Sequence, residues 1–232
     1  TQNMTQFSLR LTEVTERILS ACQRFGRNPE EITLLAVSKT QPVEAVREAA
    51  DCGQRRFGEN FVQEALAKMD ATDDLALEWH FIGRLQSNKT RQVAARFQWV
   101  QSVDREKIAR RLDDQRPFHA PPLDVCIQVA VGDEPGKGGA EASRVKPLAE
   151  LITTLPRLRL RGLMAIPPPS DDFGEQRRHF RQIRNIRDTL QADGIMLDTL
   201  SMGMTDDMEA AIAEGSTMLR IGTALFGPRH SS

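Results

Sequence analysis

Strand-like and helix-like segments alternate along nearly the whole sequence, and this alternation predicts a single closed (β/α)8 barrel, the TIM barrel. Eight strand-like units can be recognised, and each of them except the last is followed by a helix-like unit. Such alternation produces a parallel sheet, and eight units within 232 residues are enough to close it. An open doubly wound sheet is the alternative, but no G-x-G-x-x-G motif follows the first strand.

An extra amphipathic helix is expected before the barrel. Its apolar residues step by three and four, as a single buried helix face requires; they are Phe7, Leu11, Val14, Ile18, Cys22 and Phe25. The segment lacks the apolar core of a signal peptide, and Glu13 and Glu16 argue against an acid-poor transit peptide. We therefore expect this helix to belong to the folded domain.

The barrel segments follow from apolar runs and from the residues that interrupt them. Residues 32–39 form an apolar run typical of a strand buried on both faces, after which Pro42 begins a helix and Gly53 ends it. The further strands are expected at residues 56–60, 77–85, 99–103, 123–131, 158–166, 197–202 and 218–226. The helices are expected at residues 42–50, 61–69, 89–97, 105–115, 142–155, 175–192 and 207–213. No linker divides the chain, so residues 1–232 are expected to form one domain.

Charge and cysteine content exclude several classes of protein. Lysine and arginine number 31 against 32 acidic residues, so no overall basic field attracts nucleic acid or an anionic membrane. No apolar run is long enough to span a bilayer. The three cysteines, Cys22, Cys52 and Cys126, form no C-x-x-C spacing, which fits a reducing cytoplasm without structural zinc. No His, Asp and Glu residues have metal-ligand spacing, and no serine triad is recognisable, so no metal site is expected.

Lys39 raises the first functional question, because it follows the apolar run "LLAVSKT" at residues 34–40. Lysine is rarely buried, so the ordinary interpretation is that its side chain points into water. The alternative is a partly desolvated amine that acts as a nucleophile near neutral pH. The carboxyl ends of the strands carry the chemistry of a (β/α)8 barrel, and Lys39 lies at such an end, which favours the second interpretation.

Two stretches with glycine follow the seventh and eighth strands: "LSMGMTDD" from Leu200 and "RIGTALFG" from Arg220. Loops at these positions often bind phosphate in this fold. Glycine lets backbone N–H groups approach an anion, and Ser201, Thr205 and Thr223 add hydroxyl donors. Turns that need glycine for conformation alone are the alternative. Neither stretch contains lysine, so such a site would depend on neutral dipoles.

Three further polar residues lie on expected strands. Asn60 ends the second strand, where it would either face the barrel mouth or cap the next helix, and the sequence leaves both open. His80 is expected to be a hydrogen-bonded core histidine. Arg220 lies on a strand that should be buried, so it must meet an acceptor if it faces the mouth.

The stretch "GDEPGKGGA" at residues 132–140 is not a P-loop. Only three residues separate Gly132 from Gly136, and Gly138 stands where a serine or threonine must bind magnesium. We expect a flexible loop after the fifth strand, in which Lys137 is solvated.

A lysine on the first strand, a phosphate site after the last two strands and an arginine on the eighth are what pyridoxal 5′-phosphate (PLP) requires. The matching stretches are "LLAVSKT", "RFGENFVQEALAK", "WHFIGRLQSNKT", "RLRLRGLMAI" and "LSMGMTDDMEAAIAEGSTMLRIGTALFG". On these stretches the chain resembles the pyridoxal phosphate homeostasis proteins, the YggS/PROSC family, which are similar to the N-terminal barrel domain of alanine racemase. Arg84 and Thr205 depart from the usual proline and serine of this family, and residues 133–140 depart further.

The resemblance implies that Lys39 carries PLP as an internal aldimine. It implies that Asn60 lies beside the pyridine ring and that Arg220 faces the ring nitrogen. The phosphate would be held by Ser201, Gly222 and Thr223, with Met202 and Gly203 nearby.

The same resemblance favours a carrier over an enzyme, without catalytic residues. Alanine racemases need a second base, a tyrosine from a separate C-terminal domain, whereas this chain contains no tyrosine and ends soon after the eighth strand. An arginine at the pyridine nitrogen also weakens the electron sink that carbanions need. A weak amino-acid racemase of the alanine-racemase type, or an interaction protein with a vestigial site, are the alternatives. The expected partners are PLP, other B6 vitamers and PLP-dependent apoenzymes, and the chain is expected to be a cytoplasmic monomer.

Overall fold

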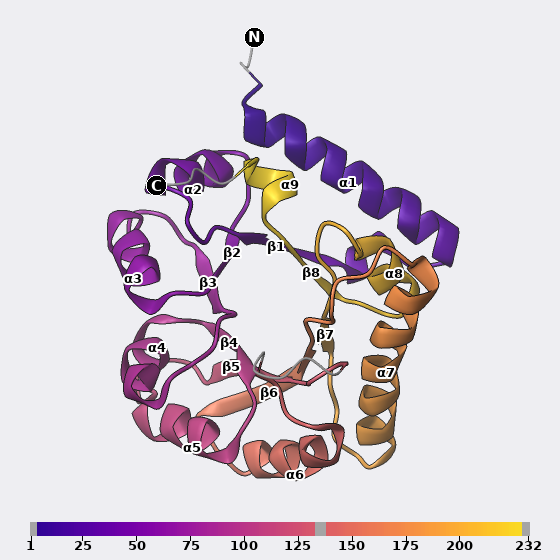
Figure 1. Ribbon diagram of the computed structural model, residues 1–232. Coiled ribbons are helices and arrows are strands. Elements are labelled where there is room, and N and C mark those ends of the chain that lie inside the picture. The colour runs from indigo at the N-terminus through magenta and orange to yellow at the C-terminus, as the bar shows by residue number, and fades with distance from the viewer. Residues whose placement is uncertain (1–3, 133–137, 229–232) are drawn as a thin grey trace.

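The computed structural model describes residues 4–132 and 138–228, which form the expected closed barrel. Its eight strands are parallel and ordered as in the sequence, and β8 pairs with β1 (Figure 1). The strands are β1 (Thr33–Val37), β2 (Arg56–Glu59), β3 (Glu78–Phe81), β4 (Trp99–Val103), β5 (Leu123–Gln128), β6 (Leu158–Met164), β7 (Thr199–Ser201) and β8 (Met218–Ile221).

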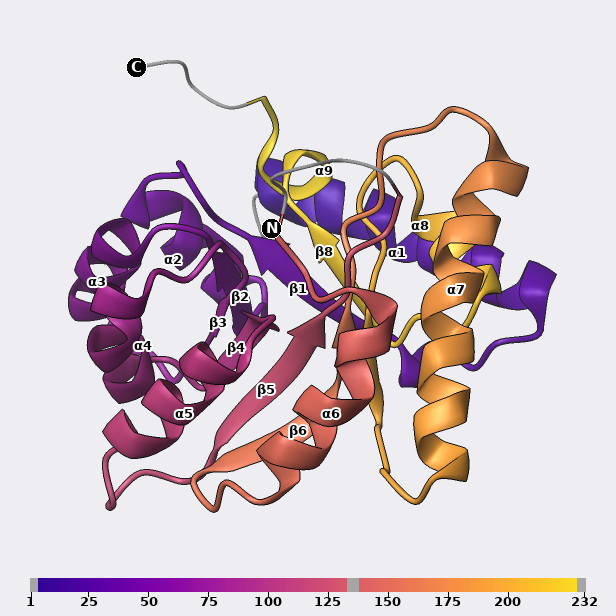
Figure 2. The same ribbon diagram turned by 60° about the horizontal axis from the view of Figure 1, so that its bottom comes forward.

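The helices surround the strands on the outside of the barrel (Figures 1 and 2). They are α1 (Gln6–Phe25), α2 (Val43–Asp51), α3 (Val62–Ala71), α4 (Thr90–Arg96), α5 (Glu106–Gln115), α6 (Ala142–Thr153), α7 (Phe173–Ala192), α8 (Met208–Ala213) and α9 (Thr223–Phe226). Two short 3-10 helices, Pro29–Glu31 and Ser87–Lys89, were not expected from the sequence.

Two apolar clusters build the core, one on each side of the sheet. The larger lies between the strands and the helices. The smaller fills the barrel interior and consists of Leu35, Val37, Ile82, Trp99, Cys126, Met164 and Met218. Because side chains alternate along a strand, this cluster identifies which residues of β1, β4, β5, β6 and β8 point inward.

The N-terminal helix forms as predicted and buries the predicted apolar face. Thr5 caps α1 by accepting a hydrogen bond from the Ser8 amide at 3.1 Å. The buried residues of α1 include Phe7, Val14 and Ile18, and Figure 1 shows the helix lying along α8 and α9.

The last predicted strand, residues 218–226, is wrong beyond Ile221. The chain turns there and forms α9, in which the amides of Leu225 and Phe226 donate to the carbonyl of Gly222, each at 2.9 Å. The apolar residues "ALF" suggested a strand, but Leu225 is buried and the Phe226 ring lies 5.4 Å from that of Phe7 on α1. The apolar side chains that were expected in the eighth strand therefore belong to α9, which packs against α1.

No helix in the described part of the chain combines the length and the apolar character needed to cross a bilayer. Within the same residues no three His, Cys, Asp or Glu side chains come together as metal ligands.

Candidate functional site

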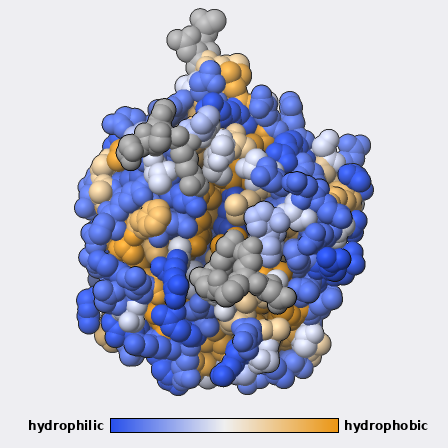
Figure 3. Space-filling view, viewed as in Figure 1, coloured by the Kyte–Doolittle hydropathy of each residue, from blue (hydrophilic) through white to orange (hydrophobic). Residues whose placement is uncertain are grey.

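The carboxyl ends of the strands form a mouth at one end of the barrel, which faces the viewer in Figure 1 and lies at the top in Figure 2. The space-filling view is hollowed there, with hydrophobic atoms on the walls and a mostly hydrophilic rim (Figure 3). Val37 and Met218 point into the barrel, so the residues two and four positions further along each strand point toward this mouth. On β8 that residue is Arg220, while Lys39 and Gly222 follow the ends of β1 and β8.

Lys39 is half-buried and lies in a tight turn directly after β1. The Gln41 amide donates to the Ser38 carbonyl at 3.0 Å, and Thr40 between them has a φ of 64°. A β-branched residue in this left-handed region costs about 1–3 kcal/mol, so the surrounding structure must hold the turn. Lys39 is thus a partly exposed lysine beside a constrained turn at the end of β1.

Asn60 resolves the alternative that the sequence left open. Helix α3 begins after Phe61 without a side-chain cap, so Asn60 does not cap it. The Oδ1 atom of Asn60 is buried and has no hydrogen-bond partner among the described residues. A buried acceptor without a donor is costly, and Asn60 is one of seven described residues with a buried side-chain nitrogen or oxygen atom that has no hydrogen-bond partner.

Arg220 is 4% exposed and meets the acceptors that its position demanded. One terminal nitrogen donates to the carbonyl and the hydroxyl of Ser201, both at 2.8 Å, and the other donates to the Ala165 carbonyl at 2.8 Å. Burial lowers the pKa of the guanidinium to about 10, which still leaves it charged at neutral pH. Arg220 therefore places a positive charge inside the mouth and joins the ends of β6, β7 and β8.

A chain of buried side chains continues from Arg220 into the barrel. The Ser201 hydroxyl donates to the amide oxygen of Gln101, and the Gln101 amide nitrogen donates to Nδ1 of His80 at 2.8 Å. The His80 ring also stacks on Trp99, with the ring centroids 4.9 Å apart. Burial lowers the pKa of His80, which confirms it as a neutral, hydrogen-bonded core histidine.

The two glycine stretches differ in why they contain glycine. Gly203 has a φ of 108°, and a Cβ there would lie 2.6 Å from the Ala211 side chain, so its conformation and packing both demand glycine. Gly222 has a φ of −112°, which any residue adopts, and a Cβ there would meet Val37 only at 3.4 Å and beyond. Conformation and packing therefore require glycine at position 203 and do not require it at position 222.

The loop between β7 and α8 is held from both sides. Asp207 accepts a hydrogen bond from the Met204 amide at 2.7 Å, and Arg17 of α1 donates to the Thr205 carbonyl at 2.8 Å. Met202 and Gly203 are buried at the start of this loop. The loop is therefore fixed before any ligand binds.

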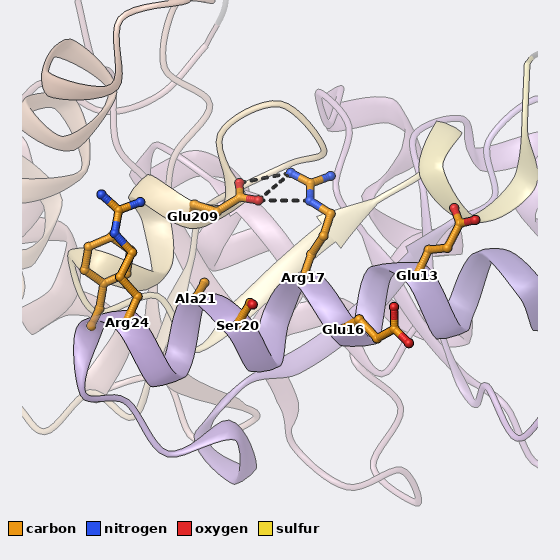
Figure 4. A pocket seen from close by; sticks show the side chains of 8 residues that line it. Glu13, Glu16, Arg17, Ser20, Ala21, Arg24 and Glu209 are labelled. Carbon is orange, nitrogen blue, oxygen red and sulfur yellow. Dashed lines mark hydrogen bonds and ion pairs between the residues drawn. The ribbon is translucent and has the colours of Figure 1, made fainter.

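A hollow of about 650 Å³ lies elsewhere, on the outer wall formed by α1 and the start of α8 (Figure 4). Arg17 and Glu209 pair across it through two hydrogen bonds of 2.9 Å. Arg17 and Glu209 thus satisfy each other, and none of the residues expected to bind PLP lines this hollow.

Lys137 lies outside the described residues, whereas the other selected residues lie at the carboxyl ends of four strands. Lys39, Asn60, Ser201, Met202, Gly203, Arg220, Gly222 and Thr223 follow or end β1, β2, β7 and β8. The family of the alanine racemase N-terminal domain matches residues 11–230. The chain belongs to this family.

Members of the family that share more of the sequence have a more specific name. The chain is 52% identical to the "Pyridoxal phosphate homeostasis protein" of Escherichia coli K12, with 99% of both chains covered. It is 54% identical to the protein of the same name from Pseudomonas aeruginosa, with 97% of both covered. These relatives confirm the resemblance that the sequence motifs indicated.

Solved structures of the family have the same fold. PipY of Synechococcus elongatus with PLP bound superimposes with a TM-score of 0.81 at 38% identity, covering 92% of this chain and all of PipY. Alanine racemase of Clostridium difficile superimposes with a TM-score of 0.71 at 15% identity, covering 94% of this chain and 57% of the racemase. The racemase supports the barrel fold alone.

Several buried polar residues near the strand ends were missed by the sequence analysis, among them Lys68 on α3, Glu59 on β2 and Gln101 on β4. One signal was present: Lys68 stands three residues after Ala65 and six after Val62, on the buried face of α3. A lysine on such a stripe predicts a buried partner.

Proposed function

We propose that this protein binds PLP at the barrel mouth through a covalent bond to Lys39 and serves cofactor homeostasis as a carrier. The observation that supports this most strongly is the buried, partnerless Oδ1 of Asn60, which lies at the same mouth as Lys39 and the Arg220 guanidinium. The family supports it as well, since its homeostasis members and PLP-bound PipY share most of this chain.

The residues present fit PLP in charge and in donor type. Its aldehyde supplies a carbon to which the Lys39 amine can bond, with the carbonyl oxygen leaving as water. The backbone N–H groups of Gly222 and Thr223, and that of Gly203 on the facing loop, would hold the phosphate without a lysine. The Met202 N–H donates to the Met218 carbonyl at 3.1 Å and so contributes no donor. Arg220 would present N–H donors to the ring nitrogen, and Asn60 would lie beside the ring.

A carrier is favoured over the racemase because this chain contains no tyrosine to serve as a second base. The Arg220 cation at the ring nitrogen also disfavours protonation of that nitrogen, so carbanions would be poorly stabilised. Exchange of the cofactor between Lys39 and another amine needs neither group. Other B6 vitamers and PLP-dependent apoenzymes are the partners we propose, for a protein that acts in the cytoplasm as a monomer.

Borohydride reduction of the PLP-loaded protein, followed by peptide mass mapping, tests the attachment site. We expect the pyridoxyl group on Lys39, and finding it mainly on Lys89 or Lys137 would overturn the assignment. Prolonged incubation with L-alanine, read by chiral chromatography, tests the carrier. Transfer of the cofactor to free amines should leave the chirality intact, whereas steady D-alanine formation that Lys39→Ala abolishes would restore the racemase.

A further inference from the structure

A second, buried lysine lies beside Lys39 and has no place in the cofactor site described above. Lys68 belongs to α3, and its side chain is 4% exposed. Its ammonium donates to the Ser38 carbonyl at 2.6 Å, to Glu59 Oε1 at 2.6 Å and to Glu64 Oε1 at 2.8 Å. An ammonium has three donors, so these acceptors occupy all of them. Lys68 is therefore not a rival nucleophile.

The residues on either side of Lys39 in the sequence, Ser38 and Thr40, both hydrogen-bond to the cluster around Lys68. Ser38, immediately before Lys39, gives its carbonyl to Lys68, and its hydroxyl donates to Glu59 Oε1 at 2.9 Å. Thr40, immediately after Lys39, donates its amide to the same Glu64 oxygen that Lys68 contacts. Since Thr40 is the residue with the left-handed φ of 64°, the contact from α3 acts where the turn is strained.

The same cluster also fixes the end of β2. Glu59 is the last residue of β2 and is fully buried, and Asn60 follows it directly. Burial raises the pKa of the Glu59 carboxyl, while Lys68 opposes that rise. Through Lys68 the backbone carbonyl before Lys39 and the carboxylate of Glu59, the residue before Asn60, are tied to one ammonium group.

A buried ion pair is a weak source of stability, because the desolvation of both charges offsets their attraction. Hydrogen bonds to an ammonium do fix position, and here they fix the two strand ends that carry Lys39 and Asn60. A contribution to folding stability therefore explains poorly why a lysine is buried here. Fixing the chain next to Lys39 and Asn60 explains each of its contacts.

We propose that Lys68, together with Glu59 and Glu64, positions Lys39 and Asn60 for PLP. Lys68 is a positioning residue that acts through the backbone and touches no part of the cofactor. The inference rests on the proposed role of Lys39 as the attachment site.

The experiment compares two matched pairs of variants. Lys68→Met and Glu64→Ala remove the cluster contacts. Arg110→Met and Glu106→Ala are the controls, because α5 carries the same acid in its first turn and the same spacing to a basic partner, at 2.8 Å. The controls are surface residues, so thermal unfolding of all four variants accompanies every measurement.

The first readout uses the apoprotein and needs no cofactor. Hydrogen exchange should speed up by several-fold to about tenfold at residues 38–41 in Lys68→Met and Glu64→Ala, as the loss of a hydrogen bond predicts. The pH dependence of Lys39 acetylation, followed by peptide mass spectrometry, should shift in the same two variants. Both controls should match the wild type.

The second readout is the rate at which PLP attaches to Lys39, which should fall by about 10- to 100-fold, the scale of a small misplacement of a reacting group. If Lys68→Met does not fold, Glu64→Ala, whose side chain is partly exposed, carries the test. Wild-type exchange, acetylation and attachment in a folded cluster variant would overturn the inference. Failure of the wild type to bind PLP would instead overturn the proposed function, while the apoprotein readouts would still judge the positioning role.

Discussion

Replacing Gly222 with alanine should weaken PLP binding while leaving the fold intact. The new Cβ would lie 3.4 Å from the Val37 carbonyl oxygen and 3.5 Å from the Val37 Cβ, which are close to ordinary contact distances, at a φ of −112° that alanine adopts freely. The free energy of unfolding should therefore change by less than about 1 kcal/mol. Because Val37 points into the barrel, the added methyl group would face the mouth.

The binding cost follows from the donors at this position. If the methyl group prevents one charge-assisted hydrogen bond to phosphate, about 1.5–3 kcal/mol is lost, which is about 10- to 150-fold in Kd. The affinity for pyridoxal, which lacks the phosphate, should be the same in the variant and the wild type. Equilibrium dialysis of the apoprotein with each vitamer, alongside thermal unfolding, measures all three quantities. Unchanged affinity for PLP, or an equal loss for both vitamers, would falsify the phosphate assignment.

Two predictions concern folding stability. Gly203→Ala should lower the free energy of unfolding in urea by about 2–5 kcal/mol, because a Cβ there would meet two side chains at 2.6 and 2.7 Å at a φ of 108°. Gly194→Ala, at a φ of 88° with nothing within 4 Å, should lower it by only about 1 kcal/mol. Equal losses in the two variants would contradict the packing argument. Burial depresses the pKa of His80 in the folded state despite Glu78 at 3.7 Å, so the unfolded chain binds the extra proton. As the pH is lowered from about 6.5, the free energy of unfolding should therefore decrease by up to about 1.4 kcal/mol per pH unit, until the pKa of folded His80 is reached. His80→Gln should make this decrease less steep. An equally steep decrease in the variant would show that another group is responsible.

The sequence predicted the barrel because its evidence was periodic and repeated. Apolar runs such as 32–39 alternate with helical segments, and the parallel topology then fixes which end of the barrel each strand reaches. The exact ends were less predictable. The strand expected at 77–85 is β3, Glu78–Phe81, because the chain leaves the sheet where Gly83 packs against the Asn60 backbone. Such a contact depends on tertiary structure and leaves no local pattern.

The candidate site was predictable at the level of position, and its supporting contacts were not. Lys39 and Arg220 stand out because charged residues interrupt apolar strands. Lys68 and Glu64, in contrast, have the spacing of an exposed ion pair on a helix surface. Only the folded chain shows that this pair is directed at the turn around Thr40, because that contact spans 24 positions along the chain.

The joint between β7 and β8 has a consequence for how the barrel responds to its ligand. These strands share one paired position, Ser201 with Met218, whereas β5 and β6 share six. The Arg220 side chain crosses this thinly paired seam, and the two proposed phosphate loops lie on opposite sides of it. A phosphate bound by both loops would hold the ends of β7 and β8 together. Slower amide exchange along β7 and β8 would then report that the cofactor is bound.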